Sequence, residues 1–262
     1  MKSPYSSLQL REIFHLEFLR WFGRKTKAEC YALKGGASLR FFFGSVRYSE
    51  DMDLDIRIIA REMLADRVMQ ILESASFRDA LITYGIQRVV PPDIARAKQT
   101  ETTQRFKVHL LTAAGEDLFS KIKFSRRGFR GETIVQAVHD VIVRAYSAAP
   151  LLVPHYTLRS AIAQKLDAFS TRTIIQARDI FDLYVLCPHY RYADGEPMRL
   201  DGAKLDKAHD NVFEIGFEQF RDTVVAYLSQ EDRGVYENEA AWDEIKMRVS
   251  DFIEEVRRGY GA

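Results

Sequence analysis

The chain has 262 residues, of which 47% are apolar, and a formal net charge of +1. This is enough apolar material for a packed core, in one large domain or two modest ones. The balanced charge excludes a globally basic nucleic-acid-binding protein, so any contact with a polyanion needs a local basic patch. No apolar run reaches the roughly 18 residues of a membrane helix, and the first residues lack the apolar segment of a secretory signal. We therefore expect no membrane span and a cytoplasmic location.

The first half of the chain is predicted to combine helices with strands. Apolar residues at helical spacing predict helices over residues 6–22 and within 60–75. Segments rich in β-branched and aromatic residues, several of them alternating, predict strands. The predicted strands are residues 30–34, 52–58, 81–90, 104–112 and 118–125.

The second half is predicted to be mostly helical. Two prolines in the segment SAAPLLVPHY, residues 147–156, predict a hinge. Beyond it, apolar stripes predict helices over 157–170, 174–186, 214–228 and 239–258. We therefore expect an α+β domain over residues 1–150 and a helical domain over residues 151–262.

One predicted strand carries carboxylates at every second position. Asp51, Asp53 and Asp55 alternate with apolar residues, so the three share one face of the strand. Neighbouring carboxylates repel one another and raise one another's pKa, and a divalent cation or a basic side chain reduces this repulsion. The alternative is a solvated strand edge whose partners are basic side chains such as Lys34 or Arg47.

A glycine pair precedes this acidic strand. Gly35 and Gly36 follow a short strand, and the helix expected to open there offers free amide donors near Ser38. Glycine allows close approach of a ligand to the backbone, and the first turn of a helix binds phosphate well. The order of glycine turn, short helix and acidic strand predicts a phosphate site beside a metal site.

The stretch LKGGASLRFFFGSVRYSEDMDLDI resembles the nucleotidyltransferase signature of the AbiEii-type abortive-infection toxins. That signature has a glycine pair, an arginine and a serine-x-aspartate-x-aspartate strand. The matching positions here are Gly35, Gly36, Arg47, Ser49, Asp51 and Asp53. Residues 158–186 resemble the family's helical motif, and the matching positions there are Lys165, Arg178, Asp179 and Asp182. The resemblance covers roughly residues 28–190.

The residues of the second motif could also have a purely structural role. Arg178 and Asp182 are four residues apart and could form an ordinary surface pair on a helix, with Lys165 a solvated lysine. Beside the first motif, we instead expect Lys165 to contact the nucleotide phosphates. An aspartate of the second helix is expected to orient or deprotonate the acceptor, across a cleft between the halves.

The resemblance implies a nucleotidyltransferase-like mixed β-sheet with flanking helices, and a Mg²⁺-dependent transfer. Asp51 and Asp53 are expected to hold the metal and, with Lys165 and Asp182, to be catalytic. The residues expected to bind the nucleotide are Gly35, Gly36, Ser38, Arg47, Ser49, Lys165, Arg178 and Asp179. A nucleoside triphosphate would donate its monophosphate to a hydroxyl of a transfer RNA 3′ end or of a protein. The resemblance further implies a toxin with a cognate antitoxin protein.

The strand at 118–125 departs from polymerase-like enzymes, which place a third carboxylate on a neighbouring strand. Here Lys121 and Lys123 share one face, and Arg126 and Arg127 follow. These residues suit phosphate or an RNA backbone, and the alternative is a solvated turn. Asp55 is a candidate third metal ligand. The six histidines show no metal-ligand spacing and are expected to be structural or exposed.

Two other functions use the same features. A kinase-like phosphotransferase would bind metal and nucleotide in the same way but react at the γ-phosphorus. A non-catalytic module for nucleic-acid or protein binding could have inherited the fold, because a fold does not guarantee chemistry.

Overall fold

The computed structural model describes residues 4–190 and 200–258, and the chain forms two compact units. Unit 1 comprises Met1–Phe42 and Tyr48–His155, and unit 2 comprises Phe43–Arg47 and Tyr156–Ala262. No helix in the described part of the chain is long and apolar enough to cross a membrane.

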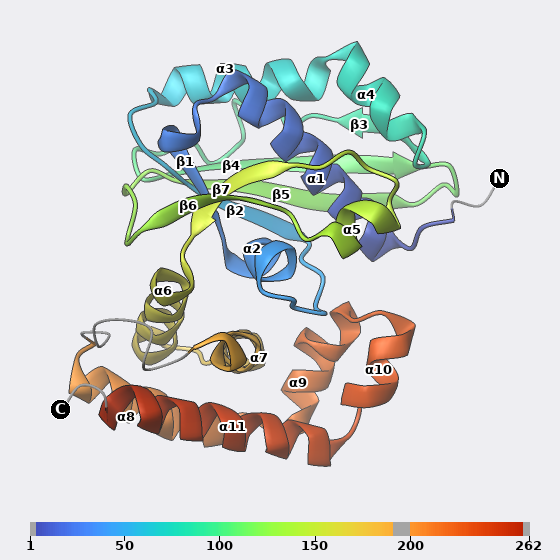
Figure 1. Ribbon diagram of the computed structural model, residues 1–262. Helices are drawn as coiled ribbons and strands as arrows, with labels where there is room; N and C mark the ends of the chain where they lie inside the picture. Colours follow the sequence, from blue (N-terminus) through green and yellow to red (C-terminus); the bar gives the residue numbers. More distant parts are fainter. Residues whose placement is uncertain (1–3, 191–199, 259–262) are drawn as a thin grey trace. The chain divides into compact units, whose positions relative to one another are not determined.

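Unit 1 is built on a mixed seven-stranded sheet with the order β3-β4-β5-β2-β1-β7-β6 (Figure 1). The strands are β1 Tyr31–Lys34, β2 Asp51–Ile56, β3 Ile86–Val90, β4 Thr103–Thr112, β5 Asp117–Ser125, β6 Thr133–Ala137 and β7 Leu152–Tyr156. Strand β2 pairs parallel with β5 and antiparallel with β1, so the acidic strand lies inside the sheet with a neighbour on each side.

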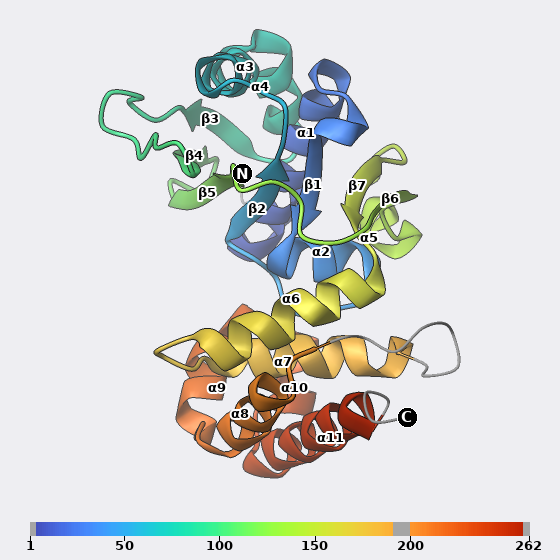
Figure 2. The same ribbon diagram turned by 90° about the vertical axis from the view of Figure 1, so that its left-hand side faces the viewer.

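Helices cover one face of this sheet. The helices of unit 1 are α1 Ser7–Lys25, α2 Gly35–Phe42, α3 Arg61–Glu73, α4 Ala75–Ile82 and α5 Asp140–Ala145, with a 3-10 turn η1 at Ala28–Cys30. Figures 1 and 2 show α1, α3 and α4 gathered over the same face. Between α1 and the sheet, Phe22 contacts Tyr31 and Phe124, with ring centroids 5.0 and 5.5 Å away. This aromatic layer is the core of unit 1.

The structure differs from the sequence predictions at the ends of several elements. Residues 81 and 82 end α4 instead of beginning a strand, because the chain turns at Gly85, whose φ of 97° favours glycine. Residues 152–156, expected within a hinge, form β7 beside β1. Apolar Leu151, Val153 and Tyr156 are buried there, so core packing outweighs the signal of the two prolines.

Unit 2 is helical in its described residues. Its elements are α6 Leu158–Thr171, α7 Ala177–Leu186, η2 Cys187–His189, α8 Gly202–Phe213, α9 Phe217–Thr223, η4 Val225–Tyr227, α10 Gln230–Tyr236 and α11 Glu239–Arg258. The helix predicted over 214–228 is therefore broken into α9 and η4. Trp242 of α11 stacks on Phe220 at 4.3 Å between centroids and donates its indole N–H to the Ile215 carbonyl. With 1% of its surface exposed, Trp242 is central to the core of unit 2.

We expect Trp242→Ala to lower the free energy of unfolding by about 3–5 kcal/mol, because it leaves a cavity and removes the stacking on Phe220. Urea unfolding followed by far-ultraviolet circular dichroism measures the loss. Trp242→Phe, which keeps a ring against Phe220, should lose clearly less. Equal unfolding midpoints for wild type and the alanine variant would contradict this role.

Candidate functional site

The acidic face of β2 lies in the middle of the sheet of unit 1. Asp51 and Asp53 are half-buried on this face, whereas Met52 and Leu54 on the other face are completely buried. The apolar side chains pack into the core and hold the strand in place. The carboxylates are thereby turned to the side of the sheet that is away from the core.

The three carboxylates of β2 have different surroundings. Asp51 forms an ion pair with Lys123 at 2.5 Å, because the parallel register brings β5 alongside. Asp55 is 2% exposed and accepts a hydrogen bond from Lys34 Nζ at 2.6 Å. The Asp53 carboxylate has no hydrogen bond or ion pair with any residue in the described ranges. Asp55 is thus neutralised within the protein, and Asp53 remains available to a ligand.

The start of α2 lies directly against Asp53. Gly35 has a φ of 69°, and a Cβ atom added to it would lie 3.1 Å from Asp53 Oδ2. A side chain at this position would therefore crowd the carboxylate. The amides of the first turn of α2 are candidates for binding phosphate.

The two serines that were predicted to bind the nucleotide, Ser38 and Ser49, have different environments. Ser49 Oγ donates to the Asp51 carbonyl at 2.7 Å and so orders the backbone at the start of β2. Ser38 lies on α2 and is 4% exposed. The structure therefore gives Ser49 a role in shaping the strand, apart from any contact with a nucleotide.

The carboxylates on the acidic face of β2 fit an open magnesium site better than a metal site formed by protein ligands alone. Among the described residues there is no group of three or more histidine, cysteine, aspartate or glutamate side chains that could hold a metal ion. Mg²⁺ is commonly held by one or two carboxylates, with the remaining ligands from substrate phosphates and water. The unpartnered Asp53 carboxylate, two residues from Asp51 and beside a helix start, fits that pattern.

Unit 2 holds a second charged cluster around α7. Asp182 is 1% exposed and accepts contacts from Lys165 Nζ and, at 3.3 Å, from Arg47 Nη2. Burial acts to raise the pKa of Asp182, but the charges of Lys165 and Arg47 prevail and lower it. Asp179, also 1% exposed, pairs with Arg172 at 2.5 Å, and there burial prevails and raises the pKa.

The reading of Arg178 and Asp182 as a surface pair is wrong. Asp182 is buried in the cluster just described, whereas Arg178 is exposed and forms no ion pair with any of the described residues. Asp182 is instead taken up by Lys165 and Arg47, so the four-residue spacing did not produce the expected pair. Arg172, which the sequence did not single out, is the partner of the other buried aspartate.

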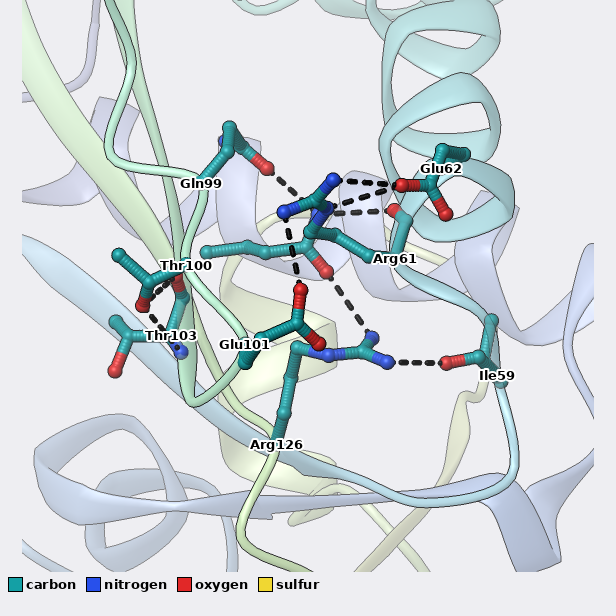
Figure 3. Close-up of polar contacts among 9 residues, drawn as sticks. Ile59, Arg61, Glu62, Gln99, Thr100, Glu101, Thr103 and Arg126 are labelled. Carbon is teal, nitrogen blue, oxygen red and sulfur yellow. Dashed lines mark hydrogen bonds and ion pairs between the residues drawn. The ribbon is translucent and has the colours of Figure 1, made fainter.

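The basic residues predicted around β5 separate into two groups. Lys123 contacts Asp51 closely and Lys121 contacts it at 3.9 Å. Arg126 instead turns inward and donates to the Ile59 carbonyl at 2.8 Å (Figure 3). It also donates to the Gln104 side chain at 3.1 Å. Arg127 is exposed. The guanidinium of Arg126 therefore stabilises the loop before α3.

Two cations that the sequence did not single out extend the basic face. Arg105 and Lys107 lie on β4 opposite Lys123 and Lys121. Both are exposed, and Lys107 lies over the Phe119 ring at 4.1 Å. The alternation of charged and apolar residues in QRFKVHLLT was the signal that could have identified them.

A shallow pocket elsewhere in unit 1 lies at the start of α3. It is lined by Arg61, Glu62, Ala65, Ile94 and Gln99. Arg61 pairs with Glu62 at 2.9 Å and with Glu101 at 3.1 Å, as Figure 3 shows. Since this cation is already neutralised and none of the predicted residues line the pocket, we do not place the functional site there.

We expect Asp182→Asn to lower the free energy of unfolding by about 3–5 kcal/mol, because it leaves Lys165 and Arg47 without their shared buried carboxylate. Urea unfolding measures the change. The matched control is Asp167→Asn, which breaks the half-exposed pair with Lys204 and should lose no more than about 1 kcal/mol. Similar losses in both variants would contradict the buried role of Asp182.

Comparison with known proteins agrees with this architecture. MenT4, a nucleotidyltransferase toxin from Mycobacterium tuberculosis, is 16% identical, with 97% of this chain and 87% of that chain covered and a TM-score of 0.64. JHP933 from Helicobacter pylori is 19% identical, with 98% and 94% covered and a TM-score of 0.58. These likenesses show the nucleotidyltransferase fold. No curated protein sequence matches the chain. Residues 17–256 match the family model described as nucleotidyl transferase AbiEii toxin, type IV TA system.

Proposed function

Because the chain belongs to the AbiEii family of nucleotidyl transferase toxins, we propose that it transfers a nucleoside monophosphate from a nucleoside triphosphate to an acceptor hydroxyl. The observation that carries the proposal is the carboxylate of Asp53, which has no partner in the described ranges and lies against the backbone of Gly35. Asp51 and Asp53 would together hold Mg²⁺. In this proposal a cognate antitoxin protein is the partner that restrains the toxin.

The residues of unit 1 would mainly position the nucleotide and screen the charge of its phosphates. Bound Mg²⁺ would neutralise charge on the phosphates and on the attacking and leaving oxygens. Asp51 would exchange its contact with Lys123 for the cation, which frees that ammonium group for a phosphate. The amides at Gly35 and Gly36 would bind a phosphate at the start of α2. Ser49 would keep the backbone of Asp51 in place.

The residues of unit 2 would act through positive charge. Lys165 and Arg47 are assigned to the nucleotide phosphates, with exposed Arg178 as a further cation. Asp182 is assigned to hold Lys165 and Arg47 in position and not to remove the acceptor's proton, because a carboxylate whose pKa is lowered is a weak base. Asp179 orients Arg172 in the same way.

An RNA acceptor, such as a transfer RNA 3′ end, is favoured over a protein by the basic face of the sheet. Lys121, Lys123, Arg105 and Lys107 lie on adjacent strands, next to Asp51, although the whole chain has a net charge of only +1. A local concentration of cations of this kind suits a phosphate backbone. Exposed Arg127 is a further candidate contact.

We expect Asp53→Asn to abolish transfer of α-phosphate label into acceptor while leaving the free energy of unfolding within about 0.5 kcal/mol of wild type, because Asp53 has no partner among residues 4–190 and 200–258 to lose. The assay combines Mg²⁺, each α-labelled nucleoside triphosphate in turn, and total transfer RNA. Asp66→Asn, which changes an exposed carboxylate on α3, is the matched control and should retain activity.

The position of the label separates the proposal from the other functions. Label that transfers only from the γ-phosphate would identify the protein as a phosphotransferase. Label that enters protein and not RNA would identify a protein acceptor. No transfer of either label would favour a non-catalytic binding module.

We expect Gly35→Ala and Gly44→Ala to be destabilising by a similar amount, about 1–2 kcal/mol, since both glycines have positive φ. Only Gly35→Ala should weaken binding of Mn²⁺ and nucleotide, because its Cβ atom crowds Asp53, whereas a Cβ at Gly44 meets open space. Titration with Mn²⁺ followed by electron paramagnetic resonance measures the binding. Equal binding by the two variants would refute the role of Gly35.

A further inference from the structure

A buried histidine lies on the helical side of the sheet, behind the acidic strand. His15 of α1 is 1% exposed, and its Nε2 lies 2.8 Å from Ser120 Oγ on β5. The Ser120 hydroxyl donates to the Glu50 carbonyl at 2.9 Å. Because the hydroxyl has one proton, His15 Nε2–H must be the donor to Ser120. Burial lowers the pKa of His15 to about 4, in keeping with a neutral ring.

A second residue of α1 holds the same junction. Arg11, one helical turn before His15, donates from Nε to the Phe119 carbonyl at 2.8 Å and pairs with the Glu50 carboxylate at 3.2 Å. Helix α1 therefore makes polar contacts with β5 and with the residue that immediately precedes β2. Most of the other buried residues of α1 are apolar, and its buried Glu12 forms a separate polar cluster with Arg40 and Tyr146.

The junction lies immediately before Asp51 on β2. Glu50 and Ser120 directly precede Asp51 and Lys121, which are paired in the register of the two strands. Side chains alternate along a strand, so Ser120 faces α1 while Lys121 faces the opposite side with Asp51. A hydrogen bond to the Glu50 carbonyl thus constrains the peptide group through which the chain enters Asp51.

We infer that His15 and Ser120 are positioning residues for Asp51, which hold its backbone in the place required for binding a divalent cation. The inference rests on the proposed function, since the role of Asp51 as a metal ligand is itself proposed. Neither residue touches the ligand; both act through the Glu50 peptide group. Outer contacts of this kind tune metal affinity in other proteins on the order of tenfold or more.

The test compares Ser120→Ala with Thr112→Val in the full chain. Both remove a buried hydroxyl that takes part in a hydrogen bond in the sheet, but Thr112 lies at the far end of β4 and accepts from the Glu116 amide. We expect Ser120→Ala to weaken Mn²⁺ binding on the order of tenfold, by electron paramagnetic resonance titration, and Thr112→Val to leave it unchanged. Equal Mn²⁺ affinities in the two variants would overturn the inference.

A second readout does not depend on the metal. Hydrogen exchange of the amides of residues 50–52 should be faster in Ser120→Ala than in Thr112→Val, because only the former frees the Glu50 carbonyl. If the wild-type protein binds no Mn²⁺, the proposed metal function is wrong, and hydrogen exchange alone tests whether Ser120 positions Asp51. Faster exchange would then support the positioning of Asp51, and unchanged exchange would overturn it.

Variants of His15 separate its hydrogen bond from its packing. His15→Gln keeps an N–H donor and should retain Mn²⁺ affinity close to wild type, whereas His15→Leu should weaken it as Ser120→Ala does. Loss of affinity in both His15 variants, with wild-type affinity in Ser120→Ala, would overturn the inference. Should His15→Leu fail to fold, Ser120→Ala carries the test.

Discussion

Unequal neutralisation of the carboxylates on β2 is the constraint on which the candidate site of unit 1 depends. The strand lies between two neighbours, so each aspartate meets a different set of cations. Asp55 is neutralised by Lys34 from β1, and Asp51 by Lys123 from β5. Asp53 faces the glycine turn, which supplies backbone instead of a cation. A positively charged ligand would neutralise the charge of Asp53 that the protein leaves unpaired.

The charged cluster of unit 2 uses the opposite arrangement. Its central carboxylate, Asp182, receives two cations, one of them from the short segment Phe43–Arg47 that is distant in sequence from α7. Breaking such a buried network leaves charges without partners, which explains why a residue in it contributes to stability as well as to any chemistry. The lowered pKa of Asp182 favours a role in holding Lys165 and Arg47 in place.

Together these clusters suit a reaction that needs positioning more than proton transfer. The described carboxylates around α7 are committed to Arg and Lys partners, and the buried His15 is held neutral behind the sheet. Phosphoryl-group chemistry is catalysed chiefly by alignment and by charge stabilisation. The protein therefore contributes rigid strands, paired charges and a helix start, and the bound cation would contribute the remaining charge.

The sequence by itself determined the local features: the shared face of Asp51 and Asp53, the glycine turn before them, most helices and strands, and the family. These depend on residue spacing within a few positions. Only the tertiary structure decided which aspartate of β2 has no partner among the described residues, that Arg126 turns inward, and that Asp182 pairs with Arg47. It also revealed the contact of His15 with Ser120. Each of these depends on residues that are distant in the chain, and their approach is set by strand register and helix packing, which no local pattern encodes.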